Sequence, residues 1–420
     1  MPKIIEILTE KISAHSAEIE NWFAQKFQEN PANFYNSVDL RHADYKIAPV
    51  DTNCFPAGFN NLSATSKIHA KNIAEKFLTQ HFPNAKNILI IPENHTRNFR
   101  YLENILVLQE ILQGAGRLVV VGSLIDELKE KTVIDLENGA QITLNPLQKN
   151  GAQILTAEGF APDLIILNND LTSGVPEILQ NLATPITPAT ALGWYQRTKS
   201  QHFTIYNKLA AEFAQIIGID PWLISSMHRS CHEVNFKEQT GIECLAKYVD
   251  ELLVALKEKY REYGIEGEPY CYIKADNGTY GMAVMPVFSS EDILEINKKE
   301  RNKMNMLKGS IVNTQVMIQE GIKTIDSINN KIAEPMIYML GGQVVGNLFR
   351  ANEQRNQLES LNSAGASFFD LTELNENEIN LGADKKNIAA VYSVMARLAA
   401  LAAAKEIGAL AAAKEINNLK

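Results

Sequence analysis

The sequence predicts an α/β protein in three parts: an N-terminal parallel α/β domain at 1–200, a mainly helical segment at 201–265 and a C-terminal α+β domain at 266–420. Solid apolar runs separated by helical spacing indicate a parallel sheet covered on both faces. These runs lie at 87–92, 117–122 and 163–168. From about residue 269 the pattern changes to strands and hairpins, which indicates a second kind of sheet.

Apolar periodicity places the other N-terminal elements. Helical spacing predicts three helices, at about 3–29, 63–80 and 99–113. Within 133–144, Asn138-Gly139 predicts the turn of a hairpin. Residues 36–61 are dense in polar and turn residues, so we expect an irregular segment there.

The second half should be helical first, from about 205 to 263. Strands are then expected at 269–275, 282–287, 315–320, 333–340 and 343–349. One helical stretch is predicted near 290–307, and one or two helices from about 383. The sequence Leu-Ala-Ala-Ala-Lys-Glu-Ile occurs at 401–407 and again at 410–416. A repeat this short adds helix propensity but makes no solenoid, so we assign it a structural role only.

Composition narrows the class of protein. With 45% hydrophobic and 21% charged residues, the chain of 420 residues is typical of globular domains. The net charge of −9 argues against a nucleic-acid partner. The N-terminus lacks a signal-peptide core, and no run approaches the roughly 20 apolar residues that cross a bilayer, so we expect a cytoplasmic protein without a membrane partner. Four scattered cysteines without a CxxC pair indicate reduced thiols. No oligomeric state is predicted.

The segment 272–284 carries the most specific chemical signal. An apolar strand ends at Lys274, a loop contains Gly278 and Gly281, and a second apolar strand follows. A lysine at a strand end can place its ammonium against nucleotide phosphates, and glycines let backbone N–H groups close over them. The segment is not a Walker loop, since no Gly-Lys-Ser/Thr ends it. An ordinary hairpin is the alternative.

This loop resembles the Lys-x-x-x-Gly-x-x-Gly loop of the ATP-grasp ligases. Residues 315–322 resemble the hinge of that fold, where backbone groups contact adenine and an acid accepts from the ribose hydroxyls. The resemblance implies ATP contacts at Lys274, Asp276, Gly278, Thr279, Gly281, Gln319, Glu320 and Ile322. Arg350 follows a hairpin turning at Gly341-Gly342 and would meet the transferring phosphate, which makes Lys274 and Arg350 the expected catalytic residues.

A metal site is expected near Glu359 and Asn362, because a carboxylate and an amide oxygen suit Mg²⁺ bridging nucleotide phosphates. ATP-grasp ligases usually carry Glu-x-Asn, whereas these two residues are three apart. The pairs at 373–375 and 415–417 also fit the pattern. In another alignment Asn362 belongs to a loop over the acceptor. The other metal ligands therefore stay open.

The polar segment 39–62 suits a zwitterionic amino acid. Its candidate substrate ligands are Arg41 and Lys46 for a carboxylate, Asp51 for an α-ammonium group, and Asn53, Asn60 and Asn61 as amide donors and acceptors. The alternative is a structured polar loop held by Pro49 and Pro56.

Two further clusters are candidates. Arg97 and Arg100 follow the predicted strand 87–92, at the end where open α/β sheets bind ligands, so they could neutralise a substrate carboxylate. Alternatively they cap a helix and face solvent. His228 and His232 are four apart, as on one helix face, but no third zinc ligand is obvious. A substrate-contact loop or a structural segment is the alternative.

The polar segment and the lysine loop together resemble one family, the proteobacterial glutamate–cysteine ligases first recognised in acidophilic iron oxidisers. The resemblance lies in residues 46–62, 91–98, 274–282 and 396–399. One departure is Ala283, where a third glycine would be expected.

The resemblance implies an ATP- and Mg²⁺-dependent condensation of the L-glutamate side-chain carboxylate with the L-cysteine amine, the first step of glutathione synthesis. Lys274 and Arg350 would neutralise phosphates, and the loop 276–281 would keep water from an acyl phosphate. Three alternatives stay open: an ATP-grasp ligase with another amine acceptor, a nucleotide-binding regulator without catalysis, and a kinase that stops at the phosphorylated carboxylate.

Overall fold

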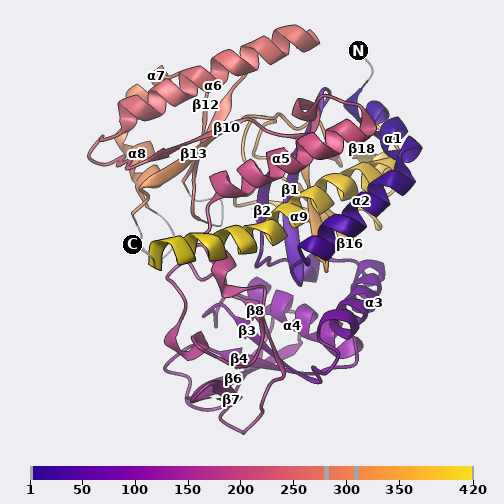
Figure 1. Cartoon of the computed structure of the whole chain (residues 1–420), viewed down its shortest axis with the longest axis vertical. Helices are drawn as coiled ribbons and strands as arrows, with labels where there is room; N and C mark the ends of the chain where they lie inside the picture. Colours follow the sequence, from indigo (N-terminus) through magenta and orange to yellow (C-terminus); the bar gives the residue numbers. More distant parts are fainter. Residues whose placement is uncertain (1–2, 279–282, 307–311, 419–420) are drawn as a thin grey trace.

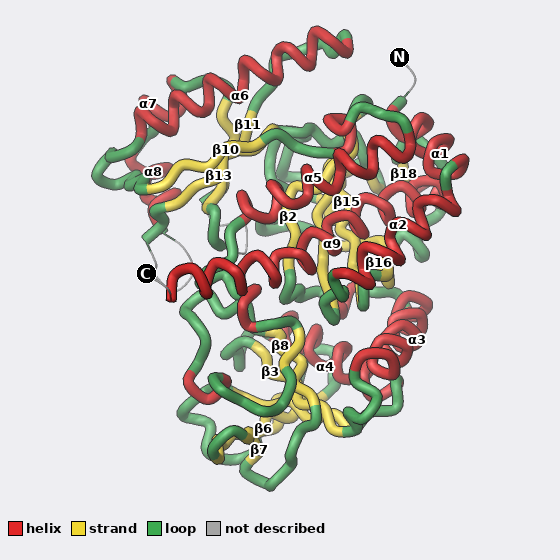
Figure 2. The backbone as a smooth tube through the Cα atoms, in the orientation of Figure 1, coloured by secondary structure: helices red, strands yellow, loops and turns green. Residues whose placement is uncertain are grey.

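The computed structural model describes residues 3–278, 283–306 and 312–418, with backbone alone from 411 onward (Figure 1). Within this part of the chain the strands form three sheets. Figure 2 shows a central sheet, with a parallel sheet beyond one end and a small antiparallel sheet beyond the other. The α/β prediction is therefore confirmed at the level of fold class.

The central sheet joins the two ends of the chain. Its main strand order is β17-β16-β15-β1-β2. The strands are β1 (Tyr35–Ala43), β2 (Lys46–Asn53), β15 (Lys331–Leu340), β16 (Gln343–Ala351) and β17 (Ser367–Asp370), extended by β14 (Ser327–Ile328) and β18 (Ile379–Asn380). The expectation of an irregular segment at 36–61 was wrong, because residues 35–53 form a hairpin. Its first strand, β1, pairs antiparallel with β15, about 300 residues away in sequence, and β2 lies at the edge of the sheet.

This pairing joins strands on either side of the predicted boundaries at 200 and 266, so the central sheet does not respect these boundaries. The three-domain division stays a prediction. Local patterns do not show such long-range pairing, because strand propensity depends strongly on neighbours brought by the fold.

Four helices share one hydrophobic core with the central sheet. They are α1 (Ile4–Ala14), α2 (Ser16–Glu29), α5 (Lys199–Ile217) and α9 (Lys385–Asn418). The helix predicted at 3–29 is two helices that meet at His15. Helix α9 departs from the expectation that no segment is long and apolar enough to cross a bilayer, since Lys385–Leu410 is both. However, 72% of its most apolar window is buried in the fold, as in a core helix.

The parallel sheet has the strand order β5-β6-β4-β3-β8-β9, with β7 paired to β6. The strands are β3 (Asn87–Pro92), β4 (Leu118–Ser123), β5 (Thr132–Asp135), β6 (Gln141–Asn150), β7 (Gln153–Thr156), β8 (Leu164–Asn168) and β9 (Ile186–Thr187). Helix α4 (Phe99–Gly114) packs on β3 and β4, and α3 (Ala64–His81) packs against α4 and against β15 and β16 of the central sheet. The predicted apolar strands, the Asn138-Gly139 hairpin and both helices are confirmed to within a few residues.

The small antiparallel sheet has the order β10-β13-β11-β12. Its strands are β10 (His228–His232), β11 (Cys271–Ala275), β12 (Val284–Val287) and β13 (Gln315–Glu320), covered by α6 (Ile242–Tyr263), α7 (Glu291–Leu294) and α8 (Lys298–Asn305). Short 3₁₀ turns lie at Phe59–Asn61, Glu177–Leu179, Thr190–Leu192, Pro221–Ile224 and Glu376–Glu378. The strand β10 interrupts the predicted helical middle, so His228 and His232 do not share a helix face.

Candidate active site

Two adjoining cavities lie where the three sheets meet. The smaller, about 70 Å³, surrounds Lys274, and the larger, about 680 Å³, extends toward the parallel sheet. Both are lined by Asp39, Asp51, Arg350 and Asn362. Because these residues form a shared wall, the two cavities adjoin each other.

Charge is concentrated in the smaller cavity. Four cationic side chains line it: Arg41, Lys199, Lys274 and Arg350. The acidic side chains there are Asp39, Asp51 and Glu334. In a chain with a net charge of −9, this local surplus of cations suits a strongly anionic ligand.

Lys274 lies near the end of β11, as the strand-and-loop pattern predicts. Its Nζ donates to the Val50 carbonyl at 3.0 Å and to Gln319 Oε1 at 2.7 Å. The Gln319 amide in turn donates to Ser226 Oγ at 2.9 Å. Burial lowers the pKa of Lys274 to about 8, although Asp51 opposes this shift. Gln319 therefore orients the Lys274 side chain. This role replaces the predicted contact between Gln319 and the nucleotide.

Arg350, on β16, is held by two carboxylates. Its Nη1 lies 2.5 Å from Glu334 Oε1 and 3.0 Å from Asp39 Oδ2. Its buried Nε has no hydrogen-bond partner among the described residues. A buried unpaired donor is costly, so an acceptor from a ligand would be favourable there.

Arg41 also lines the smaller cavity, but its guanidinium is largely occupied. It pairs with Glu334 Oε2 at 2.8 Å and donates to the carbonyls of Gln357 and Glu359 at 3.2 and 2.7 Å. It thus fastens the loop after β16 to the central sheet. The predicted free fork for a substrate carboxylate is not present in this arrangement.

Two carboxylates oppose each other across the β1–β2 hairpin. Asp39 and Asp51 are register partners, and both line the two cavities. Lys199 Nζ donates to Asp51 Oδ1 at 2.6 Å. Burial alone would raise the pKa of Asp51, but Lys199 and Lys274 hold it below its usual value. Burial, together with Glu334 and Asp51, raises the pKa of Asp39.

The larger cavity collects four of the predicted substrate residues besides Asp51. They are Asn53, Asn60, Asn61 and Arg100, although Arg100 is 80% exposed and pairs with Glu103 at 3.3 Å. Gly58, also in the wall, has a φ of +110°, and an added Cβ would come within 2.4 Å of the Tyr338 hydroxyl. Glycine is therefore required at this turn.

Sequence reasoning missed several residues of these walls: Asp39, Glu93, Tyr101, Asn168, Asp170, Trp194, Lys199, Glu334 and Tyr338. Glu93 and Asp170 follow β3 and β8 at the carboxyl edge of the parallel sheet. Open α/β sheets bind ligands at that edge, so the position of these two residues after predicted strands could have identified them from the sequence. Lys199 and Glu334 carried no comparable sequence signal.

The structure does not bring Lys46 to either cavity. Its Nζ is fully buried, 2.5 Å from Glu320 Oε1 and 3.8 Å from the centre of the Trp222 ring. Burial lowers the pKa of Lys46 to about 8 against the opposing effect of Glu320. A lysine enclosed in this way cannot contact a substrate carboxylate, so this prediction was wrong.

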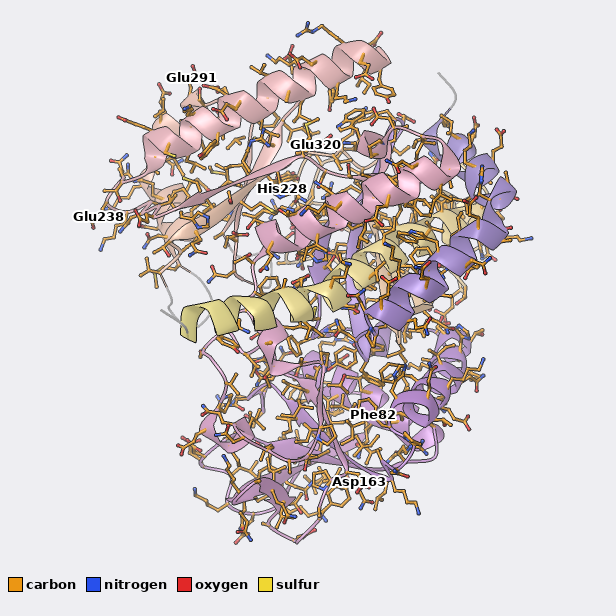
Figure 3. All side chains as sticks on the ribbon, viewed as in Figure 1. Phe82, Asp163, His228, Glu238, Glu291 and Glu320 are labelled. Carbon is orange, nitrogen blue, oxygen red and sulfur yellow. The ribbon has the colours of Figure 1, made fainter. Side chains whose placement is uncertain are left out.

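The predicted hinge is a central strand whose groups are already bonded. Glu320 Oε2 accepts from Met227 N at 2.9 Å, and Oε1 from Lys46. Its backbone N–H donates to the Met227 carbonyl, and Ile322 is buried in the core. Figure 3 labels Glu320 within the molecule near α5. Both carboxylate oxygens are occupied, so a ribose contact at Glu320 is not supported.

Three other predicted residues have local structural roles or lie outside the cavity walls. Asp276 accepts from Ser200 N at 2.7 Å and from Ser200 Oγ at 2.6 Å, which ties the lysine loop to the start of α5. Glu359 accepts from Arg355 and from Asn356 N. Arg97 is exposed and belongs to neither cavity wall.

In the lysine loop, Gly278 lines the smaller cavity, and Thr279 and Gly281 lie outside the described residues. Ala283 has a φ of +49°, in the left-handed region that favours glycine. The backbone there explains why a glycine would be expected at this position.

The predicted metal pair is not assembled. The Glu359 carboxylate is bonded within its own turn, and only Asn362 lines the cavities. The zinc alternative also fails, since the described residues contain no group of three His, Cys, Asp or Glu side chains arranged to hold a metal. His228 lies beside α5, with its Nε2 3.2 Å from Thr204 Oγ1 (Figure 3).

Fold and site together define an α/β protein with a cationic pocket suited to an anion, beside a larger cavity with room for small zwitterions. A family model described as GshA, glutamate-cysteine ligase, matches residues 9–407. A crystal structure from Methylobacillus flagellatus KT, provisionally named γ-glutamylcysteine synthetase, is 38% identical, with 96% of this chain and 95% of that chain covered and a TM-score of 0.87.

Two more distant structures were also found. A glutathione synthetase-like effector from Globodera pallida is 11% identical, covering 87% of this chain and 80% of its own, with a TM-score of 0.40. D-alanyl-alanine synthetase A from Vibrio cholerae is 11% identical, covering 74% and 81%, with a TM-score of 0.28. Neither similarity is strong enough to contribute to the assignment. A comparison with curated proteins gave no match.

The chain belongs to the glutamate–cysteine ligase family. Its activity is glutamate–cysteine ligation, which makes γ-glutamylcysteine for glutathione, and the family implies that it uses ATP.

Proposed function

We propose that the ligation proceeds by ATP-grasp-type chemistry, with the ATP phosphates in the smaller cavity and the two amino acids in the larger one. The observation that carries this proposal is the shared wall. Lys199 and Lys274 lie on the phosphate side, and Arg350 and Asp51 border both cavities. A phosphoryl group and a substrate carboxylate could therefore meet at Arg350.

In the first step, an oxygen of the L-glutamate γ-carboxylate attacks the γ-phosphorus of ATP, the bond to the β,γ-bridging oxygen breaks, and ADP leaves. In the second, the L-cysteine amine, having lost a proton, attacks the acyl carbon, and inorganic phosphate leaves with the carbon–oxygen bond electrons. Neither step needs an enzyme nucleophile. The protein contributes positioning and fixed positive charge at the transferring group.

Arg350 suits the transfer point. Two carboxylates fix its Nη1, while its Nε is unpartnered among the described residues. An anionic oxygen of the γ-carboxylate or of the phosphoryl group would supply the missing acceptor. A charge-assisted hydrogen bond of this kind is stronger than a neutral one, which favours the charged transition state.

We also propose Mg²⁺ as a cofactor, held at a different place from the one predicted. Asp39 and Asp51 face each other on the hairpin, and Asn53 follows on β2. All three residues lie at the cavity walls and carry side-chain oxygens of the kind that bind Mg²⁺. Mg²⁺ is commonly bound by one or two carboxylates together with substrate phosphates, so a preformed cage is unnecessary. Bound there, the ion would neutralise phosphate charge. Glu359 and Asn362 do not fit this role as a pair.

The test is ADP release by the purified protein with ATP and Mg²⁺, in the presence of glutamate alone, cysteine alone, both or neither, with mass detection of the dipeptide. We expect ADP formation to require both amino acids and to give a γ-linked product. Acyl phosphate chemistry predicts that ¹⁸O from the labelled γ-carboxylate appears in the released phosphate. Absence of that transfer would overturn the mechanism, and turnover with another amine would replace the acceptor.

A further inference from the structure

A buried cluster of charged side chains joins the C-terminal helix to the strand that lines the site. Glu406, on α9, has no exposed surface, and its carboxylate accepts from Arg197 Nε at 2.7 Å and from Arg197 Nη2 at 3.1 Å. The same carboxylate lies 2.5 Å from His202 Nδ1. Helix α9 packs against α5 (Figure 1). Helix α5 contains His202 and begins at Lys199, two residues after Arg197.

The third guanidinium nitrogen of Arg197 binds the strand that lines the site. Its Nη1 donates to the Thr52 carbonyl at 2.8 Å. Thr52 lies between Asp51 and Asn53, the β2 residues that line the larger cavity. The guanidinium therefore joins Glu406 on one helix to the strand segment that presents both side chains.

The segment that contains Arg197 also supports a site cation. Both Arg197 and Lys199 lie over the ring of Trp194, which lines the larger cavity. Lys199 Nζ bonds Asp51, and its backbone N–H donates to the Asp276 carbonyl at 2.7 Å in the lysine loop. Fixing Arg197 thus fixes Lys199, Asp51 and the start of that loop relative to one another.

We infer that Glu406 and Arg197 are positioning residues for the ligase reaction, which hold Lys199 and the Asp51–Asn53 segment in register with the ATP phosphates. The inference rests on the proposed placement of ATP in the smaller cavity. It also revises the structural role given to the repeat, because Glu406 belongs to its first copy. The family match, which ends at residue 407, includes this copy and excludes the second.

The first test is Glu406→Gln, which keeps shape and removes the charge that compensates Arg197. We expect roughly a tenfold or greater loss of kcat, and weaker ATP binding in calorimetry without amino acids, since small misplacements of reacting groups are costly. The KM values for glutamate and cysteine should change less than kcat. Unchanged kcat and ATP affinity in the folded variant would overturn the inference.

Because Glu406→Gln also leaves a buried arginine unpaired, a second variant separates stability from positioning. Replacing both partners, as Arg197→Met with Glu406→Met, should recover thermal stability relative to the single variant, as apolar replacements of buried ion pairs often do. The Thr52 contact stays lost, so kcat and ATP affinity should stay low. Recovery of both along with stability would show that the cluster is only structural.

The matched control is Glu20→Gln. It weakens a second Arg–Glu pair of α9, in which Arg397 donates two hydrogen bonds to Glu20 and neither residue lines a cavity wall. This variant should keep wild-type kcat and ATP affinity. The ATP-binding measurement does not require turnover, so failure of the proposed chemistry in the wild-type protein would be recognised separately from failure of this inference.

Discussion

At the scale of single residues, two buried lysines show how position decides role. Lys274 and Lys46 are both enclosed, and burial lowers both pKa values to about 8. Lys274 lines the cationic cavity, whereas Lys46 is sealed against Glu320 and Trp222. The two residues therefore form a natural pair for mutation.

Lys274→Ala should lower kcat roughly 10²-fold or more, because one preorganised charge at the transferring phosphoryl group is lost. The measurement is steady-state ADP release at saturating glutamate and cysteine, with folding checked by circular dichroism. A variant that retains full turnover would remove Lys274 from the mechanism.

The lowered pKa of Lys274 predicts a pH dependence of ATP binding. The ammonium form binds phosphate and is the main form below about pH 8, so ATP affinity of the free enzyme should fall as pH rises through that value. Calorimetry without amino acids avoids the titration of the cysteine amine. In Lys274→Arg, whose guanidinium stays charged, the decline should disappear. An identical decline in both proteins would assign the titration to another group.

At the scale of elements, the β1–β2 hairpin links the site to two sheets. Asp39, Asp51 and Asn53 face the cavities, while Lys46 at the start of β2 pairs with Glu320 at the end of β13. One hairpin therefore presents site groups and fastens the small sheet to the central one.

Lys46→Met should destabilise the protein by about 3–5 kcal/mol, because Glu320 is left buried without its cation. Urea unfolding measures this loss, and adding Glu320→Gln should recover part of it. Glutamate and ATP KM values should stay near wild type below the unfolding transition. A large rise in glutamate KM alone would restore Lys46 as a substrate ligand.

At the scale of the whole molecule, the site depends on segments from both halves of the chain. The central sheet pairs β1 with β15, and the cavities take residues from all three sheets and the loop after β16. The family match over residues 9–407 agrees with a site that needs nearly the whole chain.

The predicted domain 1–200 offers a test at this scale. Expressed alone, this fragment keeps the strands of the parallel sheet but lacks β15, the partner of β1. We expect residues 35–53 to be cleaved rapidly by protease in the fragment and slowly in the full chain, since unpaired strands expose their backbone. Equal protection in both would support the predicted boundary at 200.

The fold was predictable where the signal is local. Solid apolar runs located the strands of the parallel sheet, and Asn138-Gly139 located a hairpin. The strand-and-glycine pattern around Lys274 located the cationic end of the site. The family resemblance, carried by residues such as those at 46–62, supplied the reaction, which the comparisons confirm.

By itself, the sequence determined the fold class, most elements and the family, because periodicity, turn chemistry and short motifs lie within a few residues of one another. Only the tertiary structure decided which charges face the ligand. Lys46 and Glu320 bind each other, and Glu406 on the C-terminal helix binds Arg197. Partners brought together across hundreds of residues decide whether a buried charge is structural or functional, and no local pattern records them.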